Sequence, residues 1–349
     1  MKKYFPLFWV FYLLCAFSAH AGEGRYTIPL TGGGWSLWLD KEASWQNDRL
    51  YLPHEITDLS LLPVNVPTGG WQTLSHNPDA VPVEVPGTVE EYLTVTDNPR
   101  PENFRGVSWW YRKITIPADQ QKKRFIIYFE SVRMRAEVYL DGKLVAYDLI
   151  GETPFHVDIT DEAKPGKEQL LAIRVTNPGG NFHWQDFDIM KWGEYNIPPS
   201  RSFTGIIGRV KLESVNPVFI SDIYMQNTPE LTKVNAILSF TNETSSSVKQ
   251  DVELIVNEKG NPDKVVFRQT LKAISFPAGN HEVTIPVNVP DAKLWDLSTP
   301  ELYTCNVLIK KGKKTLDQDK KDFGFRWFTV DGVGKDAVLR DRKSTRLNS

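Results

Sequence analysis

One stretch decides the fold of this chain: Gly106 to Val145, which reads GVSWWYRKITIPADQQKKRFIIYFESVRMRAEVYLDGKLV. Its first segment, Ser108–Ile116, is rich in aromatic and β-branched residues, which favour strands. Arg124–Phe129 is a nearly continuous apolar run of strand length, as expected where both faces of a strand are covered. A third run, Ala136–Leu140, leads into Asp-Gly at 141–142 and then into further apolar residues, which is a strong hairpin signal. The stretch therefore predicts antiparallel β-structure.

Three groups of residues in this stretch resemble the N-terminal sugar-binding domain of glycoside hydrolase family 2: Trp109-Trp110-Tyr111-Arg112, Phe129-Glu130-Ser131-Val132 and Glu137–Gly142. The family includes β-galactosidases, β-mannosidases and β-glucuronidases. The resemblance implies an all-β chain, in which a jelly-roll, galactose-binding-like β-sandwich is followed by an immunoglobulin-like β-sandwich. It also implies that the chemistry lies in a TIM barrel that comes after both.

The resemblance continues along the chain in the order that the family shows. Val83–Val89 resembles the Val-Pro-Gly segment before the paired tryptophans, and Gly205–Leu212 resembles the strand that closes the first sandwich. Leu294–Tyr303 and Phe323–Trp327 resemble segments of the second sandwich. The predicted divisions are a jelly roll over 22–217, an immunoglobulin-like sandwich over 218–330 and the start of the barrel over 331–340.

Short strands separated by turn clusters are predicted throughout the second domain, and their number is that of an immunoglobulin-like sandwich. The seven candidates are Val218–Gln226, Lys233–Asn242, Val248–Asn257, Lys264–Leu271, Gly279–Val289, Tyr303–Lys310 and Lys320–Val330.

The first residues, Met1–Ala21, have the pattern of a secretory signal peptide. Two lysines precede an apolar stretch too short to span a bilayer, and Ala19-His20-Ala21 fits a cleavage site. We therefore predict a secreted or periplasmic protein whose mature chain begins at Gly22, with a membrane anchor as the alternative. The final residues, 341–349, have no apolar pattern and look like the translation of a sequencing-library adapter. They are predicted to be a non-biological artefact, with a genuine basic tail as the alternative.

Composition and motifs exclude several functions. The chain has 43 acidic and 41 basic residues and a net charge of −2, which gives no field to attract nucleic acid or an anionic membrane. Cys15 lies in the leader and Cys305 is alone in the mature chain, so no internal disulfide can form and Cys305 is expected to be a small buried hydrophobe. No HExxH motif, Cys/His cluster or Ser–His–Asp signature is found, so we predict no cofactor and no metal.

Candidate substrate-binding residues lie in the irregular segment 181–193, which has no strand or helix period. The resemblance implies that a loop at this point reaches the active site of the barrel and contacts sugar hydroxyls. An Asp carboxylate accepts hydrogen bonds from hydroxyls, and an indole covers the apolar face of a pyranose. The candidates are therefore His183, Trp184, Asp186 and Asp188, and the alternative is an ordinary packed loop.

No catalytic residue is predicted within this chain. A retaining glycosidase needs two carboxyl groups about 5–5.5 Å apart, and the resemblance implies that both are glutamates of the barrel, which the chain lacks. Glu90 and Glu91 are not accepted as a pair, because adjacent residues of a strand point to opposite faces.

The predicted function is that of an N-terminal, non-catalytic fragment of an exported family 2 retaining β-glycosidase. At full length such an enzyme hydrolyses O-glycosyl bonds of a β-linked carbohydrate substrate. A β-galactosidase is favoured, β-mannosidase and β-glucuronidase stay open, and the parent is allowed to be a homo-oligomer. The rival prediction is a stand-alone carbohydrate-binding or adhesion module. Neither involves nucleic acid, nor a membrane after leader cleavage.

Overall fold

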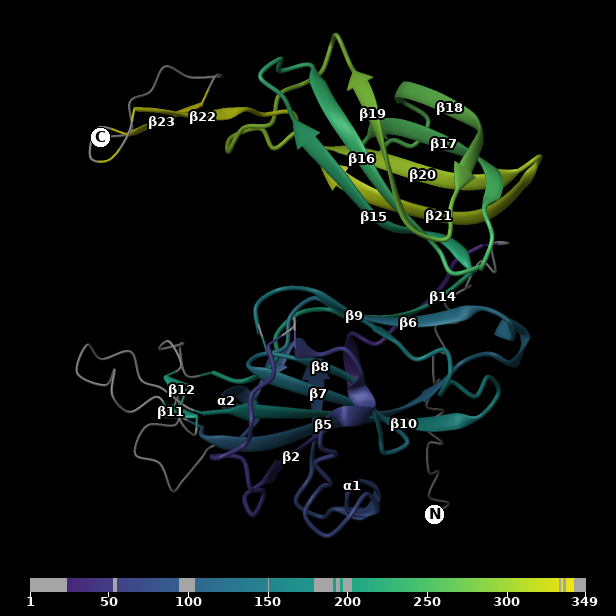
Figure 1. The fold of residues 1–349 in the computed structure, drawn as a ribbon. Helices are drawn as coiled ribbons and strands as arrows, with labels where there is room; N and C mark the ends of the chain where they lie inside the picture. The colour runs from purple at the N-terminus through teal and green to yellow at the C-terminus, as the bar shows by residue number, and fades with distance from the viewer. Residues whose placement is uncertain are drawn as a thin grey trace, which may run out of the picture.

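The computed structural model describes residues 24–52, 55–93, 104–149, 151–178, 191–192, 195–196, 203–332, 334 and 337–341. Strands dominate them, and helices are single turns, which confirms the predicted all-β class (Figure 1). The candidate residues His183, Trp184, Asp186 and Asp188 lie outside the described residues, as does the expected leader.

The first sandwich has two antiparallel sheets. The smaller sheet contains, in spatial order, β1 (Tyr26–Pro29), β14 (Val210–Val215), β6 (Arg124–Phe129) and β9 (Phe155–Asp158). The larger sheet contains β3 (Val81–Val85), β2 (Gly32–Asp40), β5 (Gly106–Thr115), β10 (Glu168–Asn177), β7 (Arg135–Leu140) and β8 (Lys143–Asp148).

The paired tryptophans of β5 explain why this strand is apolar on both faces. Trp110 points into the core between the two sheets, and Trp109 joins a second cluster on the outer face of the larger sheet. There Trp109 packs against Tyr139 and Trp71, with ring centroids 5.7 and 5.6 Å away. Trp71 belongs to the segment between β2 and β3, which also contains η2 (Leu59–Leu61) and α1 (Thr73–His76). This long connection covers the sheet, so the central strand is buried on both sides.

The predicted Asp-Gly hairpin is confirmed by its backbone. Asp141 and Gly142 both have positive φ, 49° and 84°, as a tight turn between right-twisted strands requires. The turn connects β7 to β8, which pair with each other. Asp141 also accepts hydrogen bonds from Gln169 and from the amide of Leu170, both at 2.9 Å, which fixes the turn to β10.

The second sandwich also has two sheets around its own core. One contains β15 (Val218–Asn227), β16 (Lys233–Asn242) and β19 (Gly279–Asn288), and the other contains β18 (Val265–Phe276), β17 (Val248–Glu258), β20 (Tyr303–Lys311) and β21 (Lys314–Phe323). Cys305 is fully buried in this core, and burial raises the pKa of its thiol to about 12. It is a packing residue rather than a nucleophile.

One predicted strand of this domain is wrong. The range Lys320–Val330 is not continuous, because β21 ends at Phe323 and a separate strand, β22 (Phe328–Asp331), pairs with β23 (Val338–Asp341). The break falls at Gly324, where an added Cβ would lie 2.8 Å from the side chain of Trp295. Phe325 then enters the core and forms a lone bridge with Leu294. Tertiary packing therefore divides a stretch that local pattern would keep whole.

Candidate functional site

The candidate site is the end of the first sandwich at which the segment between β10 and β14 lies. Its described parts are three short strands, β11 (Lys191–Trp192), β12 (Tyr195–Asn196) and β13 (Gly205–Ile206). β11 pairs with β12, and β13 pairs with β4 (Gly87–Thr88). Figure 1 shows β11, β12 and the one-turn helix α2 (Val89–Tyr92) at this same end. We call it the loop end.

Thr204 forms hydrogen bonds that connect the loop end to α2 and to the turn before β7. It is fully buried. Its carbonyl accepts from the amide of Val89 at 2.7 Å, and its own amide donates to Glu90 Oε2 at 3.1 Å. Its hydroxyl donates to the carbonyl of Arg133 at 2.7 Å. The backbone that leaves the candidate segment is therefore held against α2 and the turn before β7.

Arg133 forms the second half of this cluster. Its backbone exchanges two hydrogen bonds with Gly205, at 2.8 and 3.0 Å. Its guanidinium lies 4.4 Å from the ring centroid of Phe203 and pairs with Glu152. The Arg133 side chain is 7% exposed and the Glu152 side chain 66% exposed. The cation is thus enclosed while its partner is in solvent.

Glu90 is the unusual carboxyl group of the loop end. Burial raises its pKa to about 7, although the amide hydrogen bonds of Thr204 and of Glu90 itself and the charge of Arg133 lower it. Its Oε1 is buried, and the part of the chain that the structure describes offers this atom no hydrogen-bond partner. A carboxyl group with a pKa near neutrality can either donate or accept a hydrogen bond, and perturbed groups of this kind gather at functional sites.

The prediction that Glu90 and Glu91 lie on a strand is wrong. These residues are not on a strand, because they belong to α2, whose N-cap Thr88 accepts from the amide of Glu91 at 3.2 Å. Glu90 turns toward Thr204 and Glu91 is exposed. The signal was present as Thr88-x-x-Glu91, which is the pattern of a capping box. Sequence reasoning therefore missed Glu90 as a residue of the loop end.

Other kinds of site receive no support from the described residues. Within them, no group of three or more His, Cys, Asp or Glu side chains could hold a metal ion. The same part of the chain contains no helix that is long and apolar enough to cross a membrane. What the loop end offers is a carboxyl group, a guanidinium and an aromatic ring, and such groups recognise polar ligands that carry hydroxyl or carboxylate groups.

Two consecutive β-sandwiches, with a polar cluster at the loop end of the first, define a tandem-sandwich protein. The model of the sugar binding domain of glycosyl hydrolases family 2 matches residues 33–197, and a second model of glycosyl hydrolases family 2 matches residues 218–326. The chain belongs to glycosyl hydrolases family 2.

Curated relatives extend this result. A beta-glucuronidase of Formosa agariphila is 26% identical over 64% of this chain and 24% of its own length. A beta-glucuronidase of Paenibacillus borealis is 25% identical over 81% of this chain and 47% of its own. A beta-galactosidase of Bacteroides ovatus is 25% identical over 70% and 27%. The chain thus spans between about a quarter and a half of the length of these relatives.

Solved structures show the same fold. A family 2 member from Bacteroides cellulosilyticus superposes with a TM-score of 0.61 at 20% identity, covering 87% of this chain and 37% of that one. A beta-glucuronidase of Bacteroides uniformis gives 0.61 at 20% identity, covering 90% and 34%.

Proposed function

We propose that this chain is the N-terminal portion of an exported retaining β-glycosidase, and that its loop end forms part of the rim of the active site. The observation that carries the proposal is the match of both family 2 models, in order, along a chain that spans a quarter to a half of its glycosidase relatives. The catalytic carboxyl pair then belongs to the part of the parent protein that follows the second sandwich.

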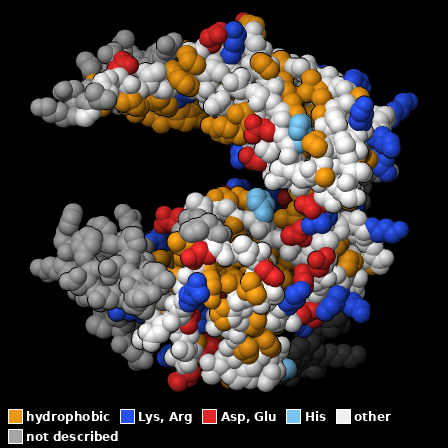
Figure 2. Space-filling view, viewed as in Figure 1, with side chains coloured by type: hydrophobic (Ala, Val, Ile, Leu, Met, Phe, Trp, Pro, Cys, Tyr) orange, Lys and Arg blue, Asp and Glu red, His pale blue; other side chains and the backbone are white. Residues whose placement is uncertain are grey.

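The arrangement of the two sandwiches supports this role for the loop end. The chain leaves the second sandwich through β22 and β23, on the same side of the molecule as β11, β12 and α2 (Figure 1). Figure 2 shows a deep hollow between the two sandwiches that opens toward this side. A following domain connected to β23 would lie beside the loop end, where Glu90, Arg133 and the segment that carries Asp186 and Asp188 would border its substrate.

The sugar is proposed as either a β-galactoside or a β-glucuronide. Sequence reasoning favoured the galactoside, and the Bacteroides ovatus relative is named for it. The relatives from Formosa agariphila and Paenibacillus borealis favour the glucuronide. An enclosed guanidinium such as Arg133, with its exposed partner Glu152, suits the carboxylate of a uronic acid.

The experiment is to express the complete reading frame that contains this chain and to assay the purified product. Turnover of aryl β-galactoside, β-glucuronide and β-mannoside is measured side by side. The proposal expects turnover of at least one of them. If Arg133 binds the carboxylate of the uronic acid, Arg133→Gln should selectively abolish turnover of the β-glucuronide. Binding of these sugars without any turnover, in a reading frame that stops soon after β23, would support the rival binding module.

A further inference from the structure

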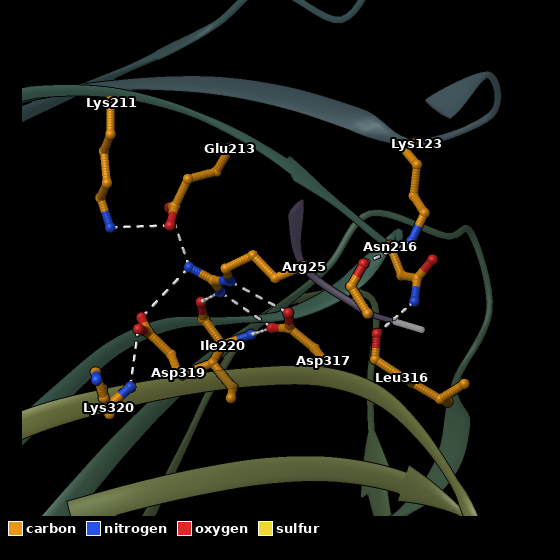
Figure 3. A network of polar contacts seen from close by, with 11 residues as sticks. Arg25, Lys123, Lys211, Glu213, Asn216, Ile220, Leu316, Asp317, Asp319 and Lys320 are labelled. Carbon is orange, nitrogen blue, oxygen red and sulfur yellow. Dashed lines mark hydrogen bonds and ion pairs between the residues drawn. The ribbon is translucent and has the colours of Figure 1, made fainter. Parts of the chain in front are cut away.

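A second polar cluster lies at the junction of the two sandwiches, away from the loop end (Figure 3). At its centre is Arg25, directly before β1. Its guanidinium donates two hydrogen bonds to the carboxylate of Asp317, from Nε at 3.2 Å and from Nη2 at 3.0 Å. Nη1 lies 3.0 Å from Glu213 and 3.3 Å from Asp319, and Nη2 also donates to the carbonyl of Ile220. This is the fork geometry in which Arg–carboxylate pairs are strongest.

These partners come from both sandwiches. Glu213 is on β14 of the first, whereas Ile220 is on β15 and Asp317 and Asp319 are on β21 of the second. The side chains of Arg25, Glu213 and Asp317 are 8, 9 and 0% exposed. One enclosed guanidinium is therefore bonded to both domains at once.

The charges around Arg25 favour its protonated form. Burial lowers its pKa, but the charges of Asp317, Glu213 and Asp319 outweigh burial and raise it. Lys211 adds a second cation, 2.9 Å from Glu213. Asp317 also accepts from the amide of Ile220 at 2.7 Å, so removing Arg25 leaves a fully buried carboxylate that is fixed to β15 without its counter-ion.

The backbone around Arg25 is held as well. Lys123, on the first sandwich, donates to the carbonyl of Gly24 at 2.9 Å. An added Cβ on Gly24 would lie 3.5 Å from the carbonyl oxygen of Leu316, on the second sandwich. Residues 24–25 therefore lie between the two domains and contact both.

Among the described residues, other contacts at the junction include an apolar cluster of Ile126, Val215 and Phe219 and the Arg124–Glu243 pair at 3.8 Å. Asn216, in the connection between the domains, also donates to the carbonyl of Leu316 at 2.5 Å. Arg25 lines two open cavities, of about 550 and 630 Å³. Interfaces between domains of one chain permit relative motion unless they are large and hydrophobic, and Arg25, which lines both cavities, is placed where it can limit that motion.

We propose that Arg25 is a positioning residue, and that residues 24–25 act as a clamp that fixes the orientation of the second sandwich relative to the first. Without the guanidinium, the two sandwiches keep their separate cores but sample a range of angles about the junction at 216–217. This proposal concerns geometry and is tested without any glycosidase activity.

The test measures the distance between spin labels on the two sandwiches by double electron–electron resonance. Labels are attached through Lys113→Cys on β5 and Lys272→Cys on β18, whose side chains are 65 and 73% exposed, while Cys305 is buried. Arg25→Gln is compared with Arg209→Gln, which breaks a surface Arg–Glu pair at 3.0 Å whose arginine is 75% exposed.

We expect a narrow distance distribution for the native protein and for Arg209→Gln. Arg25→Gln is expected to give a shifted or broadened distribution, with Arg25→Lys between the two because lysine keeps the charge without the fork. If Arg25→Gln does not fold, Glu213→Gln removes only the ion pair of Arg25 with the first sandwich. The distance distribution of this variant should change in the same way as is expected for Arg25→Gln. A distribution with both the native mean and the native width in folded Arg25→Gln or Glu213→Gln would overturn the proposal.

Discussion

Replacement of Glu90 by Gln should change how the stability of the first sandwich depends on pH. The folded protein holds the Glu90 proton with a pKa of about 7, against 4.5 for an ordinary glutamate. Since the folded state binds this proton more tightly, its favourable contribution is complete below pH 4.5 and is lost as the pH rises toward 7. The shift corresponds to about 3 kcal/mol for a fully buried group, and to about 1–2 kcal/mol for this half-buried one after solvent screening.

The assay is urea unfolding of the native protein and of Glu90→Gln between pH 4 and 8.5, followed by tryptophan fluorescence. Gln keeps an acceptor for the Thr204 amide but cannot ionise. We expect the two proteins to be about equal near pH 4.5, and the variant to be more stable by about 1–2 kcal/mol at pH 8. Glu91→Gln, on the exposed side of α2, is the matched control and should not alter the pH profile. A stability difference that is constant with pH, or that grows toward acid, would refute the reasoning.

Three further outcomes are expected. Gly205→Ala should lower the free energy of unfolding, measured in denaturant, by about 1–3 kcal/mol. The reason is that the φ of Gly205 is +152° and an added Cβ would lie 2.9 Å from Trp110. Gly33→Ala is the control, because an added Cβ there would have nothing within 4 Å. In the proposed full-length glycosidase, alanine at Asp186 or Asp188 should lower kcat/KM with little change in Tm, whereas a change confined to Tm would favour an ordinary packed loop. Intact-mass measurement of exported protein should give a chain that begins at Gly22, and an uncleaved or lipid-modified chain would contradict the predicted leader.

Strands with a clear local pattern could be predicted from the sequence closely. Arg124–Phe129 and Lys233–Asn242 have the predicted bounds, because apolar runs of strand length are set by the local sequence. The Asp141-Gly142 turn was predictable for the same reason, since few other dipeptides adopt two positive φ angles at low cost. In these elements, the pattern of apolar and polar residues along the strand itself indicates which faces are buried.

Elements decided by distant contacts could not be predicted. The end of β21 depends on Trp295 packing over Gly324, and neither residue signals the other locally. The loop end depends on Thr204 meeting Glu90, which is 114 positions earlier, so the raised pKa has no local signature. Arg25 likewise had no local signal in the sequence, because its carboxylate partner Asp317 is 292 positions away. Polar clusters of this kind form only when the fold brings their members together.

The most direct test of the account compares this 349-residue chain with the complete reading frame in one glycosidase assay. Both are purified, and turnover of aryl β-galactoside, β-glucuronide and β-mannoside is measured under the same conditions. Cleavage needs a placed acid and a placed nucleophile on opposite sides of the bond, and the account assigns both to the part that follows the second sandwich. It therefore predicts activity in the complete protein and none in this chain. Turnover by this chain that survives repurification and disappears when one of its own carboxylates is replaced would contradict it.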